Sequence, residues 1–200
     1  MADIARARKG LTLFVARDAT RASAFVDALS FFASEVEVLR FPSWDCLPYD
    51  RVSPSSGVAA DRMALLSRLA EGLDDKPRIL VTQVAAALQR VPPRTAVKRA
   101  SYAAKVGQSV DIADLEAYFA VNGYHRASTV SEKGEFAIRG GVIDVFPPSA
   151  DEPVRLDLFG DTLESIRSFD PETQRSTKQL TTVDLLPVSE ALLDAERIAR

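Results

Sequence analysis

Short apolar runs alternate with amphipathic stretches over the first hundred residues of the chain. The apolar runs are rich in Val, Leu, Ile and Phe, as buried strands are, and the amphipathic stretches have the three-to-four spacing of helices. This alternation of strand and helix predicts a parallel sheet with helices on its faces. The expected strands are 11–16, 36–39 and 78–82, and the expected helices are 20–33, 59–69 and 83–91.

The ends of these helices carry recognisable signals. Ser55 and Ser56 are both candidates for the N-cap of the second helix, because a serine hydroxyl can accept a bond from a free N–H in the first turn. Pro92 and Pro93 are expected to stop the third helix, since proline cannot continue it. The apolar stripe expected on the first helix consists of Ala22, Phe25, Leu29 and Phe32.

The pattern changes near residue 100. A helix is expected over 109–123, ended by Gly123, and the segments after it alternate with period two. Residues 160–161 have the composition of a two-residue hairpin turn, and 170–174 that of a further turn. These features predict an α+β unit with a mostly antiparallel sheet. Its expected strands are 124–128, 136–140, 142–146, 154–159, 162–169 and 181–186, and its helical stripe is Ile112, Leu115 and Phe119.

The strand VRLDLF has an unusual outer face. Its alternation places Arg155, Asp157 and Phe159 on the side away from the core. An arginine beside an exposed aromatic is the composition of a protein-binding hot spot. The alternatives are that Arg155 pairs with Asp157 or with an acid on a neighbouring strand, and that a helix covers Phe159. The core side of the strand is expected to hold Val154, Leu156 and Leu158.

Composition restricts the class of protein. The chain has 200 residues, 46% of them hydrophobic, which is enough for one large domain or two small ones. A single cysteine, Cys46, allows no intrachain disulfide, and the lone His125 argues against a zinc site. The sequence shows neither a membrane-length apolar run nor the apolar core of a signal peptide, so we expect no membrane contact and a cytoplasmic setting.

Charge is distributed unevenly along the chain. The formal net charge is −3, yet residues 1–110 hold 16 Lys and Arg against 11 Asp and Glu, whereas residues 111–200 hold 9 against 17. The second half therefore carries −8 and is poorly suited to binding a phosphate backbone. Its few arginines are expected to serve protein contacts or internal ion pairs.

The sequence contains no recognisable catalytic constellation. A nucleotide-binding loop needs a Gly-rich turn leading into Lys-Ser/Thr, and the chain has neither this motif nor GxGxxG. The pair Asp74-Asp75 lies between a helix and a strand, where a turn explains it, and Cys46 has no histidine beside it. We therefore expect no catalytic, cofactor-binding or metal-binding residue in this chain.

The segment FPSWDCLPYD, residues 41–50, has two interpretations. The first is a long connection held against the sheet by its apolar side chains. The second is a stacking platform for nucleic acid, but Arg40 and Arg51 are offset by Asp45 and Asp50, which favours the first. The side chains concerned are Phe41, Trp44, Leu47 and Tyr49.

Several motifs together resemble a known family. In the family's order they are FPSWDCLPYDRVSP, ADRMALLSRL, ILVTQVAAALQRVPPR, YHRASTVSEKGEFAIRGGVIDVFPP and VRLDLFGDTLESIRSFDPETQRS. They resemble the N-terminal, UvrB-like region of the bacterial transcription-repair coupling factors, the Mfd family. The segments GEFAIRGGVIDVFPP and RLDLFGD with DPETQ are also similar to UvrB, a subunit of nucleotide-excision repair.

The resemblance implies a domain organisation and a function. Residues 1–99 correspond to a UvrB-like α/β domain that is incomplete at its N-terminus, residues 100–187 to an inserted α+β domain that binds UvrA, and residues 188–200 to the start of a return to the first domain. The implied role is a non-catalytic adaptor that recruits UvrA to stalled RNA polymerase. The alternative is a fragment of a nucleotide-dependent repair enzyme of the UvrB or helicase class.

The resemblance also implies the site residues. Matched position by position, Arg139, Arg155 and Phe159 are the residues that dock on UvrA. RNA polymerase and DNA are partners of other parts of the family's longer proteins, as are ATP and magnesium, so this chain is expected to bind no cofactor. The glycines 140–141 suggest a bulge or a close backbone approach, so the direction of Arg139 rests on the resemblance alone.

Overall fold

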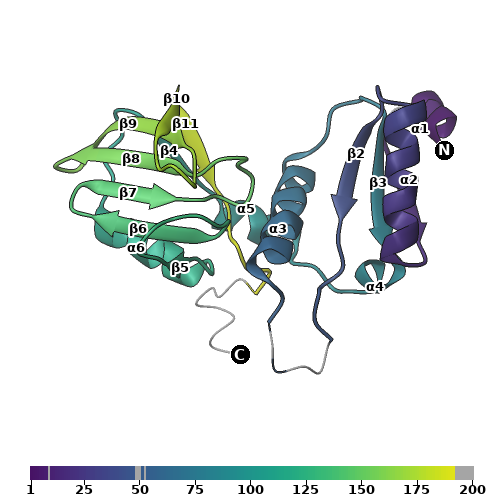
Figure 1. Cartoon of the computed structure of the whole chain (residues 1–200), viewed down its shortest axis with the longest axis horizontal. Helices are drawn as coiled ribbons and strands as arrows, with labels where there is room; N and C mark the ends of the chain where they lie inside the picture. The colour runs from purple at the N-terminus through teal and green to yellow at the C-terminus, as the bar shows by residue number, and fades with distance from the viewer. Residues whose placement is uncertain (9, 48–50, 52, 192–200) are drawn as a thin grey trace.

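The computed structural model of the chain describes residues 1–8, 10–47, 51 and 53–191. Parts of two sequence predictions lie outside the described residues: Tyr49 and Asp50 of the aromatic segment, and 192–200 of the expected return segment. Figure 1 shows two lobes, the first built on a three-stranded sheet and the second on a six-stranded sheet. We call residues 1–101 the first lobe and residues 102–189 the second lobe.

The first lobe has the parallel sheet that the sequence predicts. Its strand order is β1-β3-β2, and both pairings are parallel. Helices α1 and α2 lie on one side of the lobe, and α3 and α5 lie between the two lobes (Figure 1). The elements are α1 (Ala2–Arg8), β1 (Leu11–Ala16), α2 (Ala19–Phe32), β2 (Glu37–Phe41), α3 (Ser56–Glu71), β3 (Arg78–Gln83), α4 (Val84–Ala87) and α5 (Arg94–Ala100).

Caps and burial explain the two long helices. Ser55 is the N-cap of α3, where its hydroxyl accepts a bond from the Val58 N–H, so the first of the two candidates is correct. The stripe expected on α2 is wrong at Phe32, which is 79% exposed. The buried side of α2 follows Val26 and Leu29, with Ala22 and Phe25 packed against the same cluster, whereas Phe32 is the last residue of the helix.

The segment around the two prolines differs from the prediction. The expected helix over 83–91 shrinks to the single turn α4, and a second helix, α5, starts directly after Pro93. Proline is well tolerated at the start of a helix because the first N–H groups have no partner within the helix. Val97 of α5 is buried against Met63 of α3, so α5 covers one side of α3.

The second lobe contains two sheets and one long helix. The six-stranded sheet has the order β10-β9-β8-β7-β6-β5 and is antiparallel except for the pair β5–β6. Strands β4 and β11 form a separate antiparallel pair. The elements are β4 (Tyr102–Lys105), α6 (Ile112–Val121), β5 (His125–Arg126), β6 (Glu135–Arg139), β7 (Val142–Val145), β8 (Val154–Phe159), β9 (Thr162–Phe169), β10 (Ser176–Leu180) and β11 (Thr182–Leu185).

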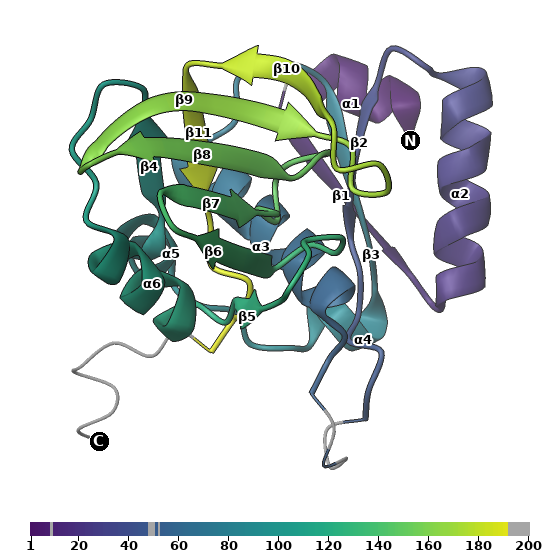
Figure 2. The ribbon, with the colours of Figure 1, turned by 60° about the vertical axis from the view of Figure 1, so that its left-hand side comes forward.

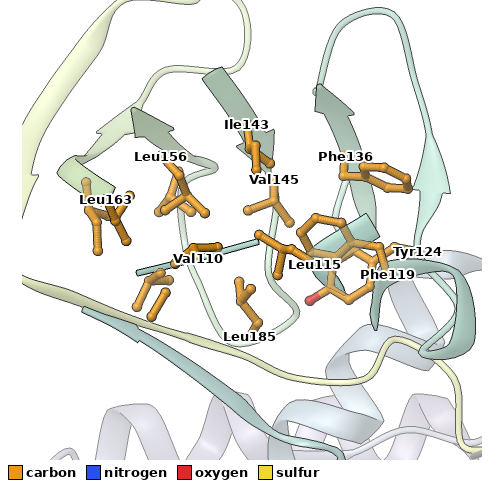
Figure 3. Close-up of a cluster of buried hydrophobic side chains, with 14 of the residues drawn as sticks. Val110, Leu115, Phe119, Tyr124, Phe136, Ile143, Val145, Leu156, Leu163 and Leu185 are labelled. Atoms are coloured by element: carbon orange, nitrogen blue, oxygen red, sulfur yellow. The ribbon is translucent and has the colours of Figure 1, made fainter. Parts of the chain in front are cut away.

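One apolar core joins these elements. Leu115 and Phe119 of α6 pack on the inner side of the six-stranded sheet, with β4 and β11 closing the cluster (Figure 3). The Phe119 ring stacks on Phe136 at 4.6 Å between ring centroids. The hydroxyl of Tyr124 donates to the carbonyl of Leu186 at 2.7 Å, and burial raises the pKa of this tyrosine.

The structure shows whether the paired glycines 140–141 form a bulge or a close backbone approach. Gly140 and Gly141 form the turn between β6 and β7, and the Leu158 N–H donates to the Gly141 carbonyl at 2.7 Å. A Cβ on Gly141 would lie 2.7 Å from the Leu158 carbonyl oxygen, so the close backbone approach is confirmed. One register shift lies in the β8–β9 pair, where Glu164 is the extra residue, and another lies in the β9–β10 pair at Thr177. Strands β6 to β10 lie side by side in Figure 2.

Candidate partner-binding face

The side of the six-stranded sheet away from the core carries a row of charged residues. Across β6, β7, β8 and β9, the strand register aligns Ala137, Asp144, Arg155 and Arg167. The next outward position on each strand adds Arg139 on β6 and Asp157 on β8. We call this surface the outer face, consisting of Arg139, Asp144, Arg155, Asp157, Phe159 and Arg167.

Arg155 is tied to its neighbour on β7. Its Nε donates to Oδ1 of Asp144 at 2.6 Å and its Nη2 donates to Oδ2 at 2.9 Å. The guanidinium also lies 4.9 Å from the ring centroid of Phe169. The bonds to Asp144 raise the pKa of Arg155. The alternative of a cross-strand acid is therefore correct for Arg155, although its partner is Asp144 and not Asp157.

Arg139 lies on the same face and reaches toward the same carboxylate. Its Nη2 is 3.5 Å from Oδ2 of Asp144 and donates to the Ser128 carbonyl at 3.0 Å. The Arg139 side chain is 54% exposed, whereas that of Arg155 is 21% exposed. The structure thus brings two of the three predicted site residues together around one buried acid.

Phe159 stands at the end of β8 with 76% of its surface exposed. It pairs with Thr162 across the predicted two-residue turn of Gly160 and Asp161. It lies four positions after Arg155, roughly 13 Å along an extended strand. The alternative in which a helix covers Phe159 is therefore wrong. Phe159 shares the outer face with the two arginines but does not touch their cluster of ion pairs.

Two residues of the outer face, Asp144 and Arg167, were missed by the sequence analysis. Arg167 donates to Asp157 at 2.6 Å, and Ser165 donates to the same carboxylate oxygen at 2.6 Å. Burial opposes ionisation of Asp157, but these two bonds outweigh it and lower the pKa of the carboxyl. The signal for Asp144 was present, since VIDVF places one acid in an otherwise apolar strand.

The N-terminus of α2, where an anion could bind, is occupied by a carboxylate of the chain itself. The side chain of Asp18 caps the helix, accepting from the Arg21 N–H at 2.8 Å. This bond and the contact with Arg17 lower the pKa of Asp18. A carboxylate therefore already fills the position at which a helix N-terminus would attract a phosphate. Over the described ranges, no three His, Cys, Asp or Glu side chains are grouped to hold a metal ion.

The sequence analysis also considered His125, Cys46 and Asp74 as candidate site residues. His125 is exposed on the short strand β5, and Cys46 is half-buried in the aromatic segment. Asp74 contacts the guanidinium of Arg78, consistent with its interpretation as part of a turn.

The aromatic segment is held by a buried arginine. The side chain of Arg62 on α3 is fully buried and lies 4.1 Å from the ring centroid of Phe41 and 5.6 Å from that of Trp44. Its Nη1 donates to the Pro42 carbonyl at 2.6 Å. These contacts favour the interpretation as a pinned connection, except at Leu47, which is 69% exposed.

Comparison with known proteins identifies the class of protein to which the second lobe and its outer face belong. Residues 103–190, which include the whole outer face, match the family model of the UvrB interaction domain. Over 91% of its length the chain is 39% identical to the transcription-repair-coupling factor of Myxococcus xanthus. Over 99% it is 31% identical to that of Escherichia coli K12, and over 90% it is 32% identical to that of Bacillus subtilis.

The chain is thus a relative of the transcription-repair-coupling factors, as its motifs predict. It spans 15–17% of the length of these three relatives. No helix within the described ranges is both long and apolar enough to cross a membrane.

Proposed function

We propose that this chain is the UvrA-recruiting part of a transcription-repair-coupling factor and that the outer face of its second lobe is the docking surface. The observation that carries the proposal is Phe159, a large aromatic with 76% of its surface in solvent, on the same sheet face as Arg139 and Arg155. Exposed aromatics beside arginines are the residues that most often dominate protein interfaces. The match to the UvrB interaction domain supports this assignment.

The finer organisation belongs to the same proposal. The first lobe would be a UvrB-like α/β domain, and residues 100–187 an inserted UvrA-binding domain. Contacts with RNA polymerase and DNA, and the use of ATP with magnesium, would belong to other parts of the longer relatives. In this role the chain itself is an adaptor without a cofactor and without catalysis.

The test is a calorimetric titration of UvrA with the parent protein and with Phe159→Ala, Arg139→Ala and Arg155→Ala. Truncation of a hot-spot side chain typically costs about 2 kcal/mol or more, roughly a thirtyfold loss of affinity. Phe32→Ala is the matched control, because Phe32 is 79% exposed but lies on the first lobe. Parental affinity in all three outer-face variants would show that the docking surface is elsewhere.

The second candidate is a nucleotide-dependent enzyme of the UvrB or helicase class. The sequence lacks the Gly-Lys-Ser/Thr of a phosphate loop, and Asp18 caps the helix that follows β1. Both observations favour the adaptor. ATP turnover by the purified chain separates the two: hydrolysis that persists through repurification and scales with protein concentration would favour the enzyme.

A further inference from the structure

Asp144 is an acid in an unusual place. It lies in the middle of β7, it points to the outer face, and its side chain is only 2% exposed. Arg155 covers it from β8 with two bonds, and Arg139 approaches it from β6 at 3.5 Å. A partner that docks on the outer face can therefore reach the two arginines but not the carboxylate between them.

The carboxylate of Asp144 lies between those two arginines and a group of apolar side chains. Its β6 neighbour Ala137 belongs to a small buried apolar cluster on this side of the sheet, and Arg155 stacks on a member of the same cluster, Phe169. A carboxylate in such surroundings is costly unless it is paired and hydrogen-bonded. The cluster consists of Val130, Ala137, Phe146 and Phe169.

One carboxylate between two guanidinium groups has two physical consequences. It offsets the repulsion between Arg139 and Arg155 and leaves one positive charge in excess. It also orders two long side chains before any partner arrives, so that less side-chain conformational freedom is lost on binding. Arg155 uses Nε and Nη2 for Asp144, and within the described residues its other N–H groups have no recorded acceptor.

We infer that Asp144 is a positioning residue for partner docking: it fixes Arg139 and Arg155 side by side, without itself touching the partner. The inference rests on the proposed function, since it concerns how the same face binds UvrA. The surface presented is a preformed pair of guanidinium groups with an excess positive charge. A carboxylate of the partner is the group that fits it, because carboxylates bind planar guanidinium groups through paired hydrogen bonds.

The experiment is a double-mutant cycle on the full chain, with UvrA affinity measured by calorimetry. Asp144→Asn keeps the shape of the side chain and removes its charge, and we expect roughly a tenfold or greater loss of affinity. In a background that carries both Arg139→Ala and Arg155→Ala the same change should have little further effect, because the two side chains that Asp144 positions are gone. A merely structural role would weaken binding equally in both backgrounds.

Two further measurements keep the result interpretable. Glu116→Gln is the matched control, since Glu116 accepts from Arg126 at 2.6 Å in the same lobe but away from the outer face. Its affinity should equal that of the parent. The arginine Nε–H signals in a ¹H–¹⁵N spectrum should show Arg155 ordered in the parent protein and mobile in Asp144→Asn.

Arg155→Lys provides a second test of the role of Asp144 if the Asp144→Asn variant does not fold. Lysine keeps the charge but cannot make the two-bond fork, so we expect a loss close to that of Arg155→Ala. Parental affinity in Arg155→Lys or in folded Asp144→Asn, with Arg155→Ala still weakened, would overturn the role of Asp144 alone. Parental affinity in Arg139→Ala, Arg155→Ala and Phe159→Ala would overturn the docking surface itself, and this inference with it.

Discussion

Both carboxylate oxygens of Glu190 contact the guanidinium of Arg62, and this ion pair joins two parts of the chain that are 128 residues apart. Arg62 lies on α3 of the first lobe, whereas Glu190 directly follows the second lobe. The side chains are 0% and 10% exposed. The indole N–H of Trp44 donates to the same carboxylate at 3.1 Å. One acid therefore connects the two lobes and the aromatic segment.

Glu190→Ala should destabilise the protein strongly and release the aromatic segment. The change leaves Arg62 buried without its partner, which typically costs about 3–5 kcal/mol. Trp44 is the single tryptophan of the chain, so its emission should shift to longer wavelength as the ring gains solvent. Chemical denaturation and intrinsic fluorescence measure both effects. Glu190→Gln, which retains hydrogen-bonding oxygen, should be milder, and an alanine variant with parental stability and emission would contradict the expectation.

Leu156→Ala and Phe159→Ala should differ in their effect on the free energy of unfolding, although both residues lie on β8. Leu156 is 1% exposed, so its truncation should lower the free energy of unfolding by about 2–5 kcal/mol. Phe159 is exposed, and substitutions at such positions usually change stability by about 0.5 kcal/mol or less. Urea denaturation of both variants measures the difference. Equal destabilisation would mean that Phe159 is covered in solution.

Asp157→Asn should change how stability depends on pH. The folded-state pKa of Asp157 lies below its ordinary value of 3.8, so the unfolded chain takes up a proton first as the pH falls. The stability that Asp157 contributes is therefore complete above roughly pH 5 and is lost as the pH falls below 3.8. The parent should exceed the variant in stability at neutral pH, and the gap should close in acid. Denaturation curves at several pH values test this, and a constant gap would contradict it.

The second lobe should fold alone, and its stability should depend on where the fragment ends. Residues 100–187 have their own helix, sheets and core, but Val188 is 3% exposed in that core and its N–H donates to the Asn122 carbonyl at 2.8 Å. Burial of a valine side chain contributes about 1.5–3 kcal/mol. A 100–190 fragment should therefore unfold cooperatively and be more stable than 100–187 in thermal denaturation. A non-cooperative transition for 100–190 would refute independent folding.

The chain should bind duplex DNA only weakly. Residues 111–200 carry a charge of −8, and the excess positive charge of residues 1–110 is small. We expect a dissociation constant in the range of about 10⁻⁴–10⁻⁶ M, typical of non-specific contact at physiological salt. Fluorescence anisotropy with a labelled duplex measures it. Nanomolar affinity would mean that the charge argument omits a concentrated basic surface.

Local signals in the sequence were sufficient for much of the fold. The outward position of Phe159 followed from the alternation in VRLDLF, because side chains of a strand point to opposite faces in turn. The start of α3 followed from Ser55, since the capping hydroxyl acts within a single turn. Features of this kind depend on neighbours in the chain, and the sequence displays those neighbours directly.

The features that the sequence analysis missed depend on residues far apart in the chain. Asp144 meets Arg155 only because β7 and β8 pair in one particular register, which VIDVF alone does not specify. Strand β10 has exposed polar residues, so period two gave no apolar face to recognise. Helix α5 was missed because the paired prolines were interpreted as a stop, although proline equally marks a start.

The pairing of β4 with β11 brings the two ends of the second lobe together. These are the first and last strands of the second lobe, and Tyr102 lies opposite Leu185 in their ladder. The two ends of the lobe therefore lie side by side, and a unit with adjacent ends can be inserted into a loop of another protein with little disturbance. The second lobe therefore has the arrangement of chain ends that a transferable structural unit needs.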